Sequence, residues 1–413
     1  IILMMARFGP MIQSRFRRAQ ESFASISSFV QESFSGIRTI KGFVQEKNEQ
    51  RGFSERCNDY VDRNIDLIRV WGFFFPSITL LANLSLAILY LVGGRAVIGR
   101  VLTFGEFISL TMYINLLVWP VIAIGWVFTL LQRGVASGRR ILDMLETVPD
   151  VSESEKVDRT ITDISGRVEI RDLRFHYPGT ESDMLKGISV VVEPGGSLGI
   201  MGRPGSGKST LFSLLFRLFP VPEGVIYIDG HEIHEISLPV LRGSIGYVPQ
   251  DPFLFSDTVK GNLAFGLEEG EYDLDEMERV TKLCGIYEDI MGFSKGFDTP
   301  VGERGVTLSG GQLQRLSIAR AMLLHPNILV LDDALSQVDA STEMQVLENL
   351  FASTRETTLI LASHRVSTVR RCDTIMVLDS GRVAQKGRHE DLLKESGFYS
   401  TVFDLQKLEE EIA

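Results

Sequence analysis

The sequence predicts two structural parts: a partial α-helical transmembrane domain, followed by an α/β domain with a largely parallel sheet. Three observations support this. Two long segments in the first third of the chain carry no charged residue, a polar and acidic stretch follows them, and short apolar runs then alternate with helical stretches. The 413 residues, 44% of them hydrophobic and 23% charged, fit one apolar part joined to an ordinary soluble part.

The two uncharged segments are residues 70–94 and 107–132. A transmembrane helix needs about 20 mostly apolar residues, so both can cross a bilayer with some tilt. The alternative, a buried helix of a soluble core, rarely runs so far without a charge. The loop between the segments is short, which predicts a helical hairpin. Lys and Arg are frequent in residues 14–69 and return at Arg133, Arg139 and Arg140, so we expect both flanks to be cytoplasmic.

The segment before the first span is polar with regularly spaced apolar residues. Steps of three and four predict a long amphipathic helix that projects into the cytosol and is broken near Gly36 and Gly42. The apolar positions are Phe23, Ile26, Val30, Phe34, Ile37, Ile40 and Phe43. The first residues, IILMMARFGPMI, resemble the end of a membrane helix, so we expect a fragment that begins inside the transmembrane domain.

The change in composition sets the expected domain boundaries. They are a partial transmembrane domain at 1–146, a polar linker at 147–165 and the α/β domain at 166–413. Strands are expected at 168–175, 197–201, 328–332, 358–363 and 374–379. The sequence Asp379-Ser-Gly381 between two apolar runs predicts a late hairpin.

The net charge argues against one class of partner, and the cysteines argue against a disulfide framework or a zinc site. A net charge of −11 argues against a nucleic acid, whose phosphates require a basic face. Cys57, Cys284 and Cys372 are scattered and form no CxxC pair, so they are expected to be reduced packing residues.

A phosphate-binding motif, GxxxxGK[ST], follows the apolar run at 197–201. Its glycines let backbone N–H groups turn toward a phosphate, its lysine reaches the β- and γ-phosphate oxygens, and its serine hydroxyl binds Mg²⁺. The helical stretch STLFSLLFRLF comes next, and its N-terminus favours an anion. The motif predicts a nucleotide site at Gly202, Arg203, Gly205, Ser206, Gly207, Lys208, Ser209 and Thr210.

Two adjacent carboxylates, Asp332 and Asp333, end the apolar run ILVL. An aspartate at a strand end can be a solvated surface residue. Beside a phosphate-binding loop, Asp332 fits the carboxylate that binds Mg²⁺.

Further motifs follow in a fixed order: Gln250 in YVPQ, LSGGQ at 308–312, ILVLDD, SQVD ending at Asp339, and His364 in LASH. Together with the phosphate-binding loop this set resembles the ATPase domain of ABC transporters, a P-loop NTPase fold. The resemblance covers essentially the whole chain. The two spans resemble the last two transmembrane helices of an exporter half-transporter. Residues 33–46 resemble the loop whose short coupling helix docks on the partner's ATPase domain, and VGERG at 301–305 is similar to an exporter segment.

The resemblance implies roles for these residues in a dimer that holds two ATP molecules and Mg²⁺. Tyr177 would stack on adenine, unless it is only a strand residue. Lys208, Ser209, Gln250 and Asp332 would hold phosphates and Mg²⁺. His364 would contact the γ-phosphate, unless it is incidental. Ser309, Gly310, Gly311 and Gln312 would contact the ATP held by the other subunit; the plainer alternative is that they only form the N-terminal cap of a helix. Asp339 would lie in a loop that bridges the two ATP sites.

Asp333 departs from the family pattern, in which efficient hydrolases carry Glu to polarise the attacking water. Asp is shorter by one C–C bond, about 1.5 Å, and a misplacement of about 1 Å can cost about 10²-fold in rate. We therefore expect ATP to bind well here and to be hydrolysed slowly. SQVD also departs from the usual Ser-Ala-Leu-Asp, while LSGGQ is intact. This combination resembles the degenerate-site subunit of heterodimeric bacterial exporters.

The leading interpretation is one half of a heterodimeric exporter, multi-pass in a bacterial inner membrane with its ATPase domain in the cytoplasm. Its partners would be the bilayer, a different half-transporter that carries the catalytic Glu, and hydrophobic or amphipathic drugs or lipids. Phe73–Phe75, Met112, Tyr113 and Trp119 are candidates for the substrate cavity, although aromatic residues in a span are often packing residues. The alternatives are a homodimer with slow hydrolysis by Asp333, a soluble ATPase acting on DNA, and an inert nucleotide-gated scaffold.

Overall fold

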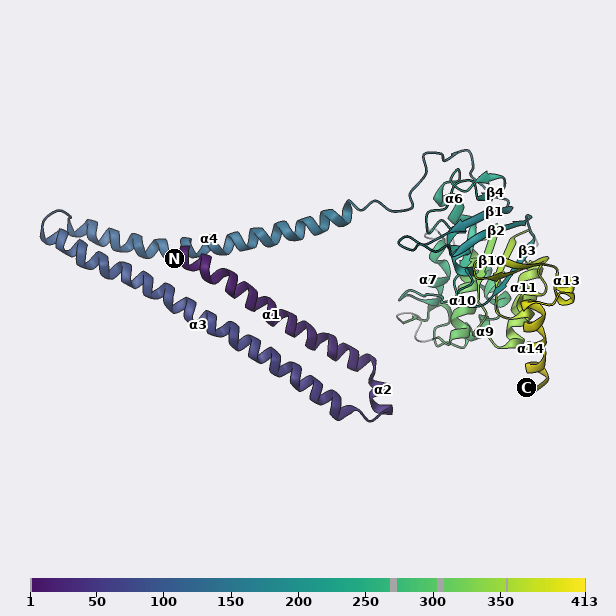
Figure 1. The fold of residues 1–413 in the computed structure, drawn as a ribbon, viewed down its shortest axis with the longest axis horizontal. Helices are drawn as coiled ribbons and strands as arrows, with labels where there is room; N and C mark the ends of the chain where they lie inside the picture. Colours follow the sequence, from purple (N-terminus) through teal and green to yellow (C-terminus); the bar gives the residue numbers. More distant parts are fainter. Residues whose placement is uncertain (1, 268–272, 303–307, 354–355, 413) are drawn as a thin grey trace. The chain divides into compact units, whose positions relative to one another are not determined.

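The structure is a computed structural model, and it describes residues 2–267, 273–302, 308–353 and 356–412. The chain divides into two compact units, Ile1–Thr147 and Val148–Ala413. The first unit is helical and the second is built on β-sheets (Figure 1).

The helical unit contains α1 (Ile2–Ser35), α2 (Ile37–Gly42), α3 (Glu46–Ile98) and α4 (Phe104–Leu145). Helices α1 and α3 lie side by side and run in opposite directions, with α2 between them at one end (Figure 1). The predicted breaks near Gly36 and Gly42 are confirmed. The predicted segment does not continue as one helix into the first span, because the chain reverses at residues 43–45, where Val44 has a φ of 54°. Its projection into the cytosol stays a prediction.

The contacts between α1 and α3 explain the spacing of apolar residues before the first span. The Phe23 and Tyr60 rings lie 5.7 Å apart, and Ser22 Oγ donates to the Asp59 carboxylate over 2.7 Å. Part of the stripe therefore pairs two antiparallel helices, whereas Phe34, Ile37 and Phe43 are exposed.

Helices α3 and α4 contain the two predicted spans and are joined by residues 99–103. Among the described residues, α3 is the one helix long and apolar enough to cross a membrane, and the described apolar stretch of α4 is Phe104–Leu117. Thr103 begins α4 with a capping box: its side chain accepts from the Glu106 N–H, and the Glu106 carboxylate accepts from the Thr103 N–H.

The second unit is built around a six-stranded sheet with the order β10-β9-β3-β8-β7-β6. All neighbours pair in parallel except β10, which forms the predicted hairpin with β9. The strands are β3 (Ser197–Gly202), β6 (Ile245–Val248), β7 (Ile328–Asp332), β8 (Thr358–Ala362), β9 (Thr374–Asp379) and β10 (Arg382–Gly387). The largely parallel sheet is thus confirmed, and β7 and β8 are buried at every residue.

A second sheet, antiparallel and with the order β2-β1-β4-β5, was not predicted. Its strands are β1 (Val168–Phe175), β2 (Leu185–Val192), β4 (Ile226–Ile228) and β5 (His231–Glu232). The prediction that residues 168–175 belong to the parallel sheet is wrong. The sequence VEIRDLRF largely alternates apolar and polar residues, which is typical of a strand buried on one face only, and that is how β1 lies.

Helices cover these sheets and enclose two groups of buried apolar residues. One group packs between the two sheets and around the helix after β3, and the other lies under the helices that follow β6 and β7. The helices are α5 (Lys208–Leu215), α6 (Leu238–Gly243), α7 (Val259–Leu263), α8 (Leu274–Leu283), α9 (Tyr287–Met291), α10 (Gly310–Leu323), α11 (Ala340–Ser353), α12 (Val366–Val369), α13 (His389–Lys394) and α14 (Phe398–Ile412), with short 3₁₀ turns at Ala264–Gly266 and Gly296–Asp298.

The segment between α4 and β1 has no helix or strand, but from Ser152 onward it makes contacts with the second unit. The Ser152 carbonyl accepts from Arg217 over 3.1 Å, Lys156 pairs with Glu223 at 2.7 Å, and Ile164 is buried. Although the segment is polar, part of it is therefore packed on the second unit and is not a flexible linker.

Candidate nucleotide site

Several predicted site residues meet at one edge of the six-stranded sheet. Strands β3, β6, β7 and β8 are parallel, so their C-terminal ends lie at the same edge. Asp332 is in register with Ala362 of β8, and Ile200 of β3 pairs with the same residue. Gln250 follows β6, and His364 follows β8. Residues far apart in the sequence are thus brought to the rim where α/β folds bind ligands.

The phosphate-binding loop connects β3 to α5. Gly202 ends a strand that is buried throughout, and Gly207 has a φ of 105° at the start of the helix. A Cβ at Gly207 would lie 2.6 Å from Leu185 Cδ2, so this turn requires glycine. The loop curls around the Lys208 side chain, whose Nζ donates to the Gly202 carbonyl over 2.8 Å and to the Arg203 carbonyl over 3.3 Å.

This loop is suited to hold an anion. The Lys208 ammonium is buried, and burial lowers its pKa while the nearby Asp332 and Asp333 charges raise it. Its hydrogen bonds go to neutral carbonyl oxygens, so its charge lacks a directly bonded counter-ion. Ser206 Oγ is also buried and has no hydrogen-bond partner. A phosphate would supply acceptors for both groups, which fits the residues present.

Asp332 is 2% exposed at the end of β7. Burial raises the pKa of its carboxyl, while a hydrogen bond from Ser209 and the positive charge of Lys208 lower it. No group of three or more His, Cys, Asp or Glu suited to a metal occurs in the part of the chain that the structure describes. One carboxylate beside a serine hydroxyl instead fits Mg²⁺, which keeps waters and takes its other ligands from a nucleotide's phosphates.

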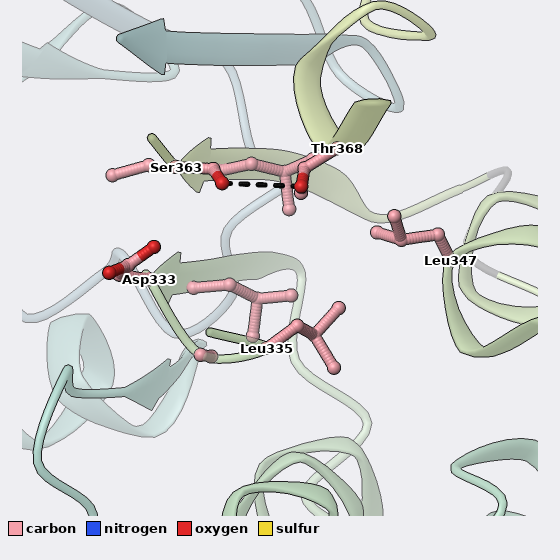
Figure 2. Close-up of a pocket in the computed structure, with 9 residues that line it drawn as sticks. Asp333, Leu335, Leu347, Ser363 and Thr368 are labelled. Carbon is pink, nitrogen blue, oxygen red and sulfur yellow. Dashed lines mark hydrogen bonds between the residues drawn. The ribbon is translucent and has the colours of Figure 1, made fainter. Parts of the chain in front are cut away.

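Asp333 comes directly after β7, with a φ of 50° and a half-buried side chain. Its backbone N–H donates to the Ala362 carbonyl over 2.9 Å. Figure 2 shows its carboxylate pointing away from Leu335 and Leu347, which line the same small cavity. The backbone at this position is therefore tied to β8, and only the side chain can extend toward a ligand.

Tyr177 lies two residues after β1 and is held beside α5. Its hydroxyl and that of Thr210 are 2.8 Å apart. Its ring forms perpendicular pairs with Phe175 and Phe219, with ring centroids 5.2 and 5.1 Å apart. The structure thus places this aromatic ring next to the phosphate-binding helix.

His364 lies in the loop at residues 363–366, which we call the switch loop. It is half-buried and close enough to Asp332 for a positive charge on its ring to lower the pKa of that carboxyl. Gln250 is exposed at the end of β6, the neighbour of β7. Both residues therefore lie at the edge that carries Asp332.

Ser309–Gln312, which we call the signature turn, begins α10. Ser309 caps this helix by accepting from the Gln312 N–H over 3.3 Å, and the Gln312 side chain accepts from the Ser309 N–H over 3.0 Å. The plainer alternative, a capping box, is therefore present, and it leaves Ser309 exposed. Across the described residues no hydrogen bond or salt bridge links this turn to the phosphate-binding loop of the same chain.

A contact missed by the sequence analysis explains both glycines of the signature turn. A Cβ at Gly310 would collide with the Gln337 side-chain amide, and a Cβ at Gly311 would lie 2.9 Å from the Gln337 carbonyl oxygen. Gln314 of α10 is buried and accepts from the Gln337 N–H over 2.9 Å. The signature turn is thus packed against residues 336–339, which we call the bridging loop.

Asp339, at the end of the bridging loop, caps α11. Its carboxylate accepts from Ser341 Oγ over 2.6 Å and from the Thr342 N–H over 3.0 Å. These hydrogen bonds hold the pKa of the Asp339 carboxyl well below its usual range.

An ion pair with a buried carboxylate joins the bridging loop to the switch loop, and the sequence patterns did not predict it. Glu343 is 3% exposed and accepts from the Arg365 guanidinium and, over 2.5 Å, from Thr368 Oγ1. Arg365 also donates to the Ser336 carbonyl over 3.4 Å, and Ser363 donates to Thr368 over 3.2 Å, as Figure 2 shows. Glu343 and Ser336 are more than twenty positions from their partners Arg365 and Thr368, so no local motif reveals these contacts.

The VGERG segment stays untested, because its residues 303–305 lie outside the described residues. The rest of the geometry defines a class. A glycine-rich loop between a buried strand and a helix, with a buried lysine and a carboxylate at the end of a parallel strand of the same sheet, is the site of a P-loop nucleotide-binding domain. In this chain the domain follows a long apolar helix that can cross a membrane.

Comparison with known proteins specifies this class. Residues 185–336 match the family described as "ABC transporter", and residues 1–121 match "ABC transporter transmembrane region". The chain is 38% identical to the Multidrug resistance-like ATP-binding protein MdlA of Escherichia coli (strain K12) over 409 residues, which are 98% of this chain and 68% of that protein.

Two further similarities cover nearly the whole chain. The Probable multidrug resistance ABC transporter ATP-binding/permease protein YheI of Bacillus subtilis (strain 168) is 38% identical over 403 residues, 97% of this chain and 68% of that protein. The solved "Structure of a bacterial Atm1-family ABC exporter with ATP bound" matches with a TM-score of 0.84 and 30% identity, covering 98% of this chain and 71% of that chain.

The chain belongs to the ABC transporter family and is an exporter half-transporter with a transmembrane region and an ATP-binding ATPase domain. It is a multi-pass protein of the inner membrane, and its ATPase domain is cytoplasmic.

Proposed function

We propose that this half-transporter pairs with a different half-transporter, binds ATP at a site where hydrolysis is slow, and completes the partner's faster site with its signature turn. The observation that carries this proposal is Asp333. It occupies the position where efficient family members have Glu, and its backbone N–H is tied to Ala362. The main chain cannot advance to compensate for the shorter side chain.

The nucleotide site of this chain would use the residues gathered at the sheet edge. Lys208 would bind phosphate oxygens, Tyr177 would stack on adenine, and His364 would contact the γ-phosphate. Ser209, Gln250 and Asp332 would hold Mg²⁺, which neutralises phosphate charge as the terminal phosphoryl group leaves. Each of these side chains would bind or orient ATP. None of them would act as the general base, and Asp333, at the position of the base, is too short to reach the water.

The signature turn would act on the partner's ATP. Ser309 is exposed at the start of a 14-residue helix, so its hydroxyl proton and the Gly310 and Gly311 N–H groups, which the capping box does not use, can meet an anion from outside this chain. Asp339 and the bridging loop would lie between the two ATP sites. Contact between Gln337 and Gly310 then makes the position of the turn depend on this chain's own bridging loop.

Coupling to the membrane domain would pass through α2. Ile37 of α2 and Phe43, which follows it, are exposed. The ATPase domain exposes a cluster of three aromatic rings, in which Phe255 stacks on Phe265 and lies perpendicular to Phe253. We propose that α2 docks on this cluster of the partner subunit. Changing Phe43 to Ser should lower transport more than basal ATPase activity, and equal losses would contradict the coupling role.

The transported compounds are proposed to be hydrophobic or amphipathic drugs or lipids. Of the candidates for the substrate cavity, Phe74 is buried and packs near Phe8. The others, Phe73, Phe75, Met112, Tyr113 and Trp119, are exposed on α3 and α4, and the two relatives named above are called multidrug resistance proteins. ATPase stimulation by such compounds in lipid nanodiscs would test the class of substrate.

The test of the pairing compares two substitutions in the assembled transporter. Asp333→Asn should retain ATPase activity within about twofold, whereas Ser309→Arg should lower it by about 10²-fold or more, because it blocks the site that hydrolyses. Ser353→Arg, at an exposed serine of α11, is the control for an added charge.

Two outcomes would contradict the proposal. One is a loss of orders of magnitude with Asp333→Asn alone. The other is vanadate-sensitive ATPase of the chain purified without any partner, which would favour a homodimer with slow hydrolysis by Asp333.

A further inference from the structure

The last helix, α14, packs through one stripe of residues. Tyr399, Val402 and Phe403 contact the buried core of the ATPase domain, and Tyr399 is fully buried, with its hydroxyl 2.7 Å from His389 Nδ1. Steps of three and four place Gln406 next on the same face, while Asp404 and Leu405 are exposed. An amide therefore continues a stripe that is otherwise apolar or aromatic.

The nitrogen and the oxygen of the Gln406 side-chain amide each form a hydrogen bond, and both hydrogen bonds are to main-chain atoms of the switch loop. Gln406 Nε2 donates to the His364 carbonyl over 3.0 Å, and Gln406 Oε1 accepts from the Val366 N–H over 2.8 Å. Val366 is the first residue of α12, and its N–H has no acceptor within that helix. The two bonds bracket Arg365 and fix the main chain on the C-terminal side of His364.

The other side of the switch loop is fixed separately. The Arg365 guanidinium binds Glu343, and Ser363 Oγ accepts from the Arg365 N–H over 3.0 Å. Without Gln406 these bonds would still hold Ser363 and the Arg365 side chain. The His364 carbonyl and the Val366 N–H would lose the partners that set the orientation of the peptide carrying the His364 side chain.

We propose that Gln406 is a positioning residue for His364. Docking of the C-terminal helix α14 then sets how tightly the switch loop holds bound ATP. The proposal rests on the proposed contact of His364 with the γ-phosphate. Gln406 acts through the main chain of the switch loop and touches no nucleotide itself.

The test uses the assembled full-length transporter and 8-azido-ATP, whose cross-linking to this chain reports occupancy of this chain's site alone. The variants are Gln406→Met, which keeps the length without the amide, Gln406→Glu, which keeps an acceptor but has no donor for the His364 carbonyl, and His364→Ala. Asp404→Ala is the matched control on an exposed position of the same helix.

We expect His364→Ala and Gln406→Met each to weaken nucleotide retention by about tenfold, the effect of losing one hydrogen bond to a charged group, and Asp404→Ala to leave it unchanged. In the His364→Ala background, Gln406→Met should cause no further loss. Thermal unfolding of the Gln406 variants should match that of Asp404→Ala.

Two results would overturn the role of Gln406: full retention in both Gln406 variants, or losses that add to that of His364→Ala. Full retention in His364→Ala would instead contradict the proposed contact of His364, and Gln406 would lose its role with it.

Discussion

The backbone N–H of Asp333 donates to the Ala362 carbonyl oxygen over 2.9 Å. This bond joins the residue after β7 to the last residue of β8, at a position with a φ of 50°. The carboxylate is therefore carried by a main chain with little freedom to move toward a ligand. The length of the side chain alone decides whether a base can reach the attacking water, and this explains why one methylene is expected to matter so much.

Loss of the Lys208 ammonium should weaken ATP binding at this chain's site. Lys208→Ala removes a buried charge that donates to Gly202 and Arg203 and would pair with phosphate. Hydrogen bonds to a charged group are worth about 1.5–3 kcal/mol, so affinity should fall by about 10–100-fold. Titration with a fluorescent ATP analogue would measure this. Lys156→Ala, at an exposed pair with Glu223, is the control, and equal affinity in both variants would contradict the assignment.

The two glycines of the signature turn should differ in how a methyl group is tolerated. At Gly311 the added Cβ meets the Gln337 carbonyl of the main chain, so Gly311→Ala should lower stability by about 1–3 kcal/mol. At Gly310 it meets the movable end of the Gln337 side chain. Thermal unfolding should show that Gln337→Ala relieves the cost of Gly310→Ala and not that of Gly311→Ala. Relief of both, or of neither, would contradict the packing described.

The Asp339 cap should stabilise the protein in a pH-dependent way. Hydrogen bonds from Ser341 and Thr342 lower the pKa of this carboxyl in the folded state. Its contribution is therefore complete above the ordinary pKa of Asp, about 4, and is lost as the pH falls below that value. Chemical unfolding should show a constant gap between the wild type and Asp339→Asn from pH 8 to 5 that narrows in more acidic solution. A gap that widens with acid would contradict the cap.

The cysteines should differ in reactivity. Burial raises the pKa of the Cys284 thiol to about 12 and also raises that of Cys372, whereas Cys57 is half-buried. At pH 8 a maleimide should label Cys57 and react with the other two only after unfolding. Mass spectrometry of the native protein would show this, and rapid labelling of Cys284 would contradict its position in the core.

Sequence patterns predicted the elements whose signals are local. Strands β7 and β8 are largely continuous apolar runs, and the phosphate-binding loop is a motif of eight consecutive residues. The second sheet was missed because β4 has only three residues and β5 only two, and β1 was assigned to the wrong sheet although it alternates.

Contacts between distant loops could not be predicted in this way. The packing of Gln337 on Gly310 and the pair of Glu343 with Arg365 depend on how three loops meet at the end of the sheet. Gln406 was detectable in principle, because the stripe of Tyr399, Val402 and Phe403 points to it. Its partners at His364 and Val366 needed the fold.

The most direct test of the slow site lengthens the side chain that is too short. In the assembled transporter, Asp333→Glu should raise single-turnover hydrolysis of ATP at this chain's site by about 10²-fold, because the carboxylate then reaches the water. Asp333→Gln, equally long but without a base, should give no increase. If Asp333→Glu binds ATP normally and hydrolyses it no faster than the wild type, the length of Asp333 is not what limits this site.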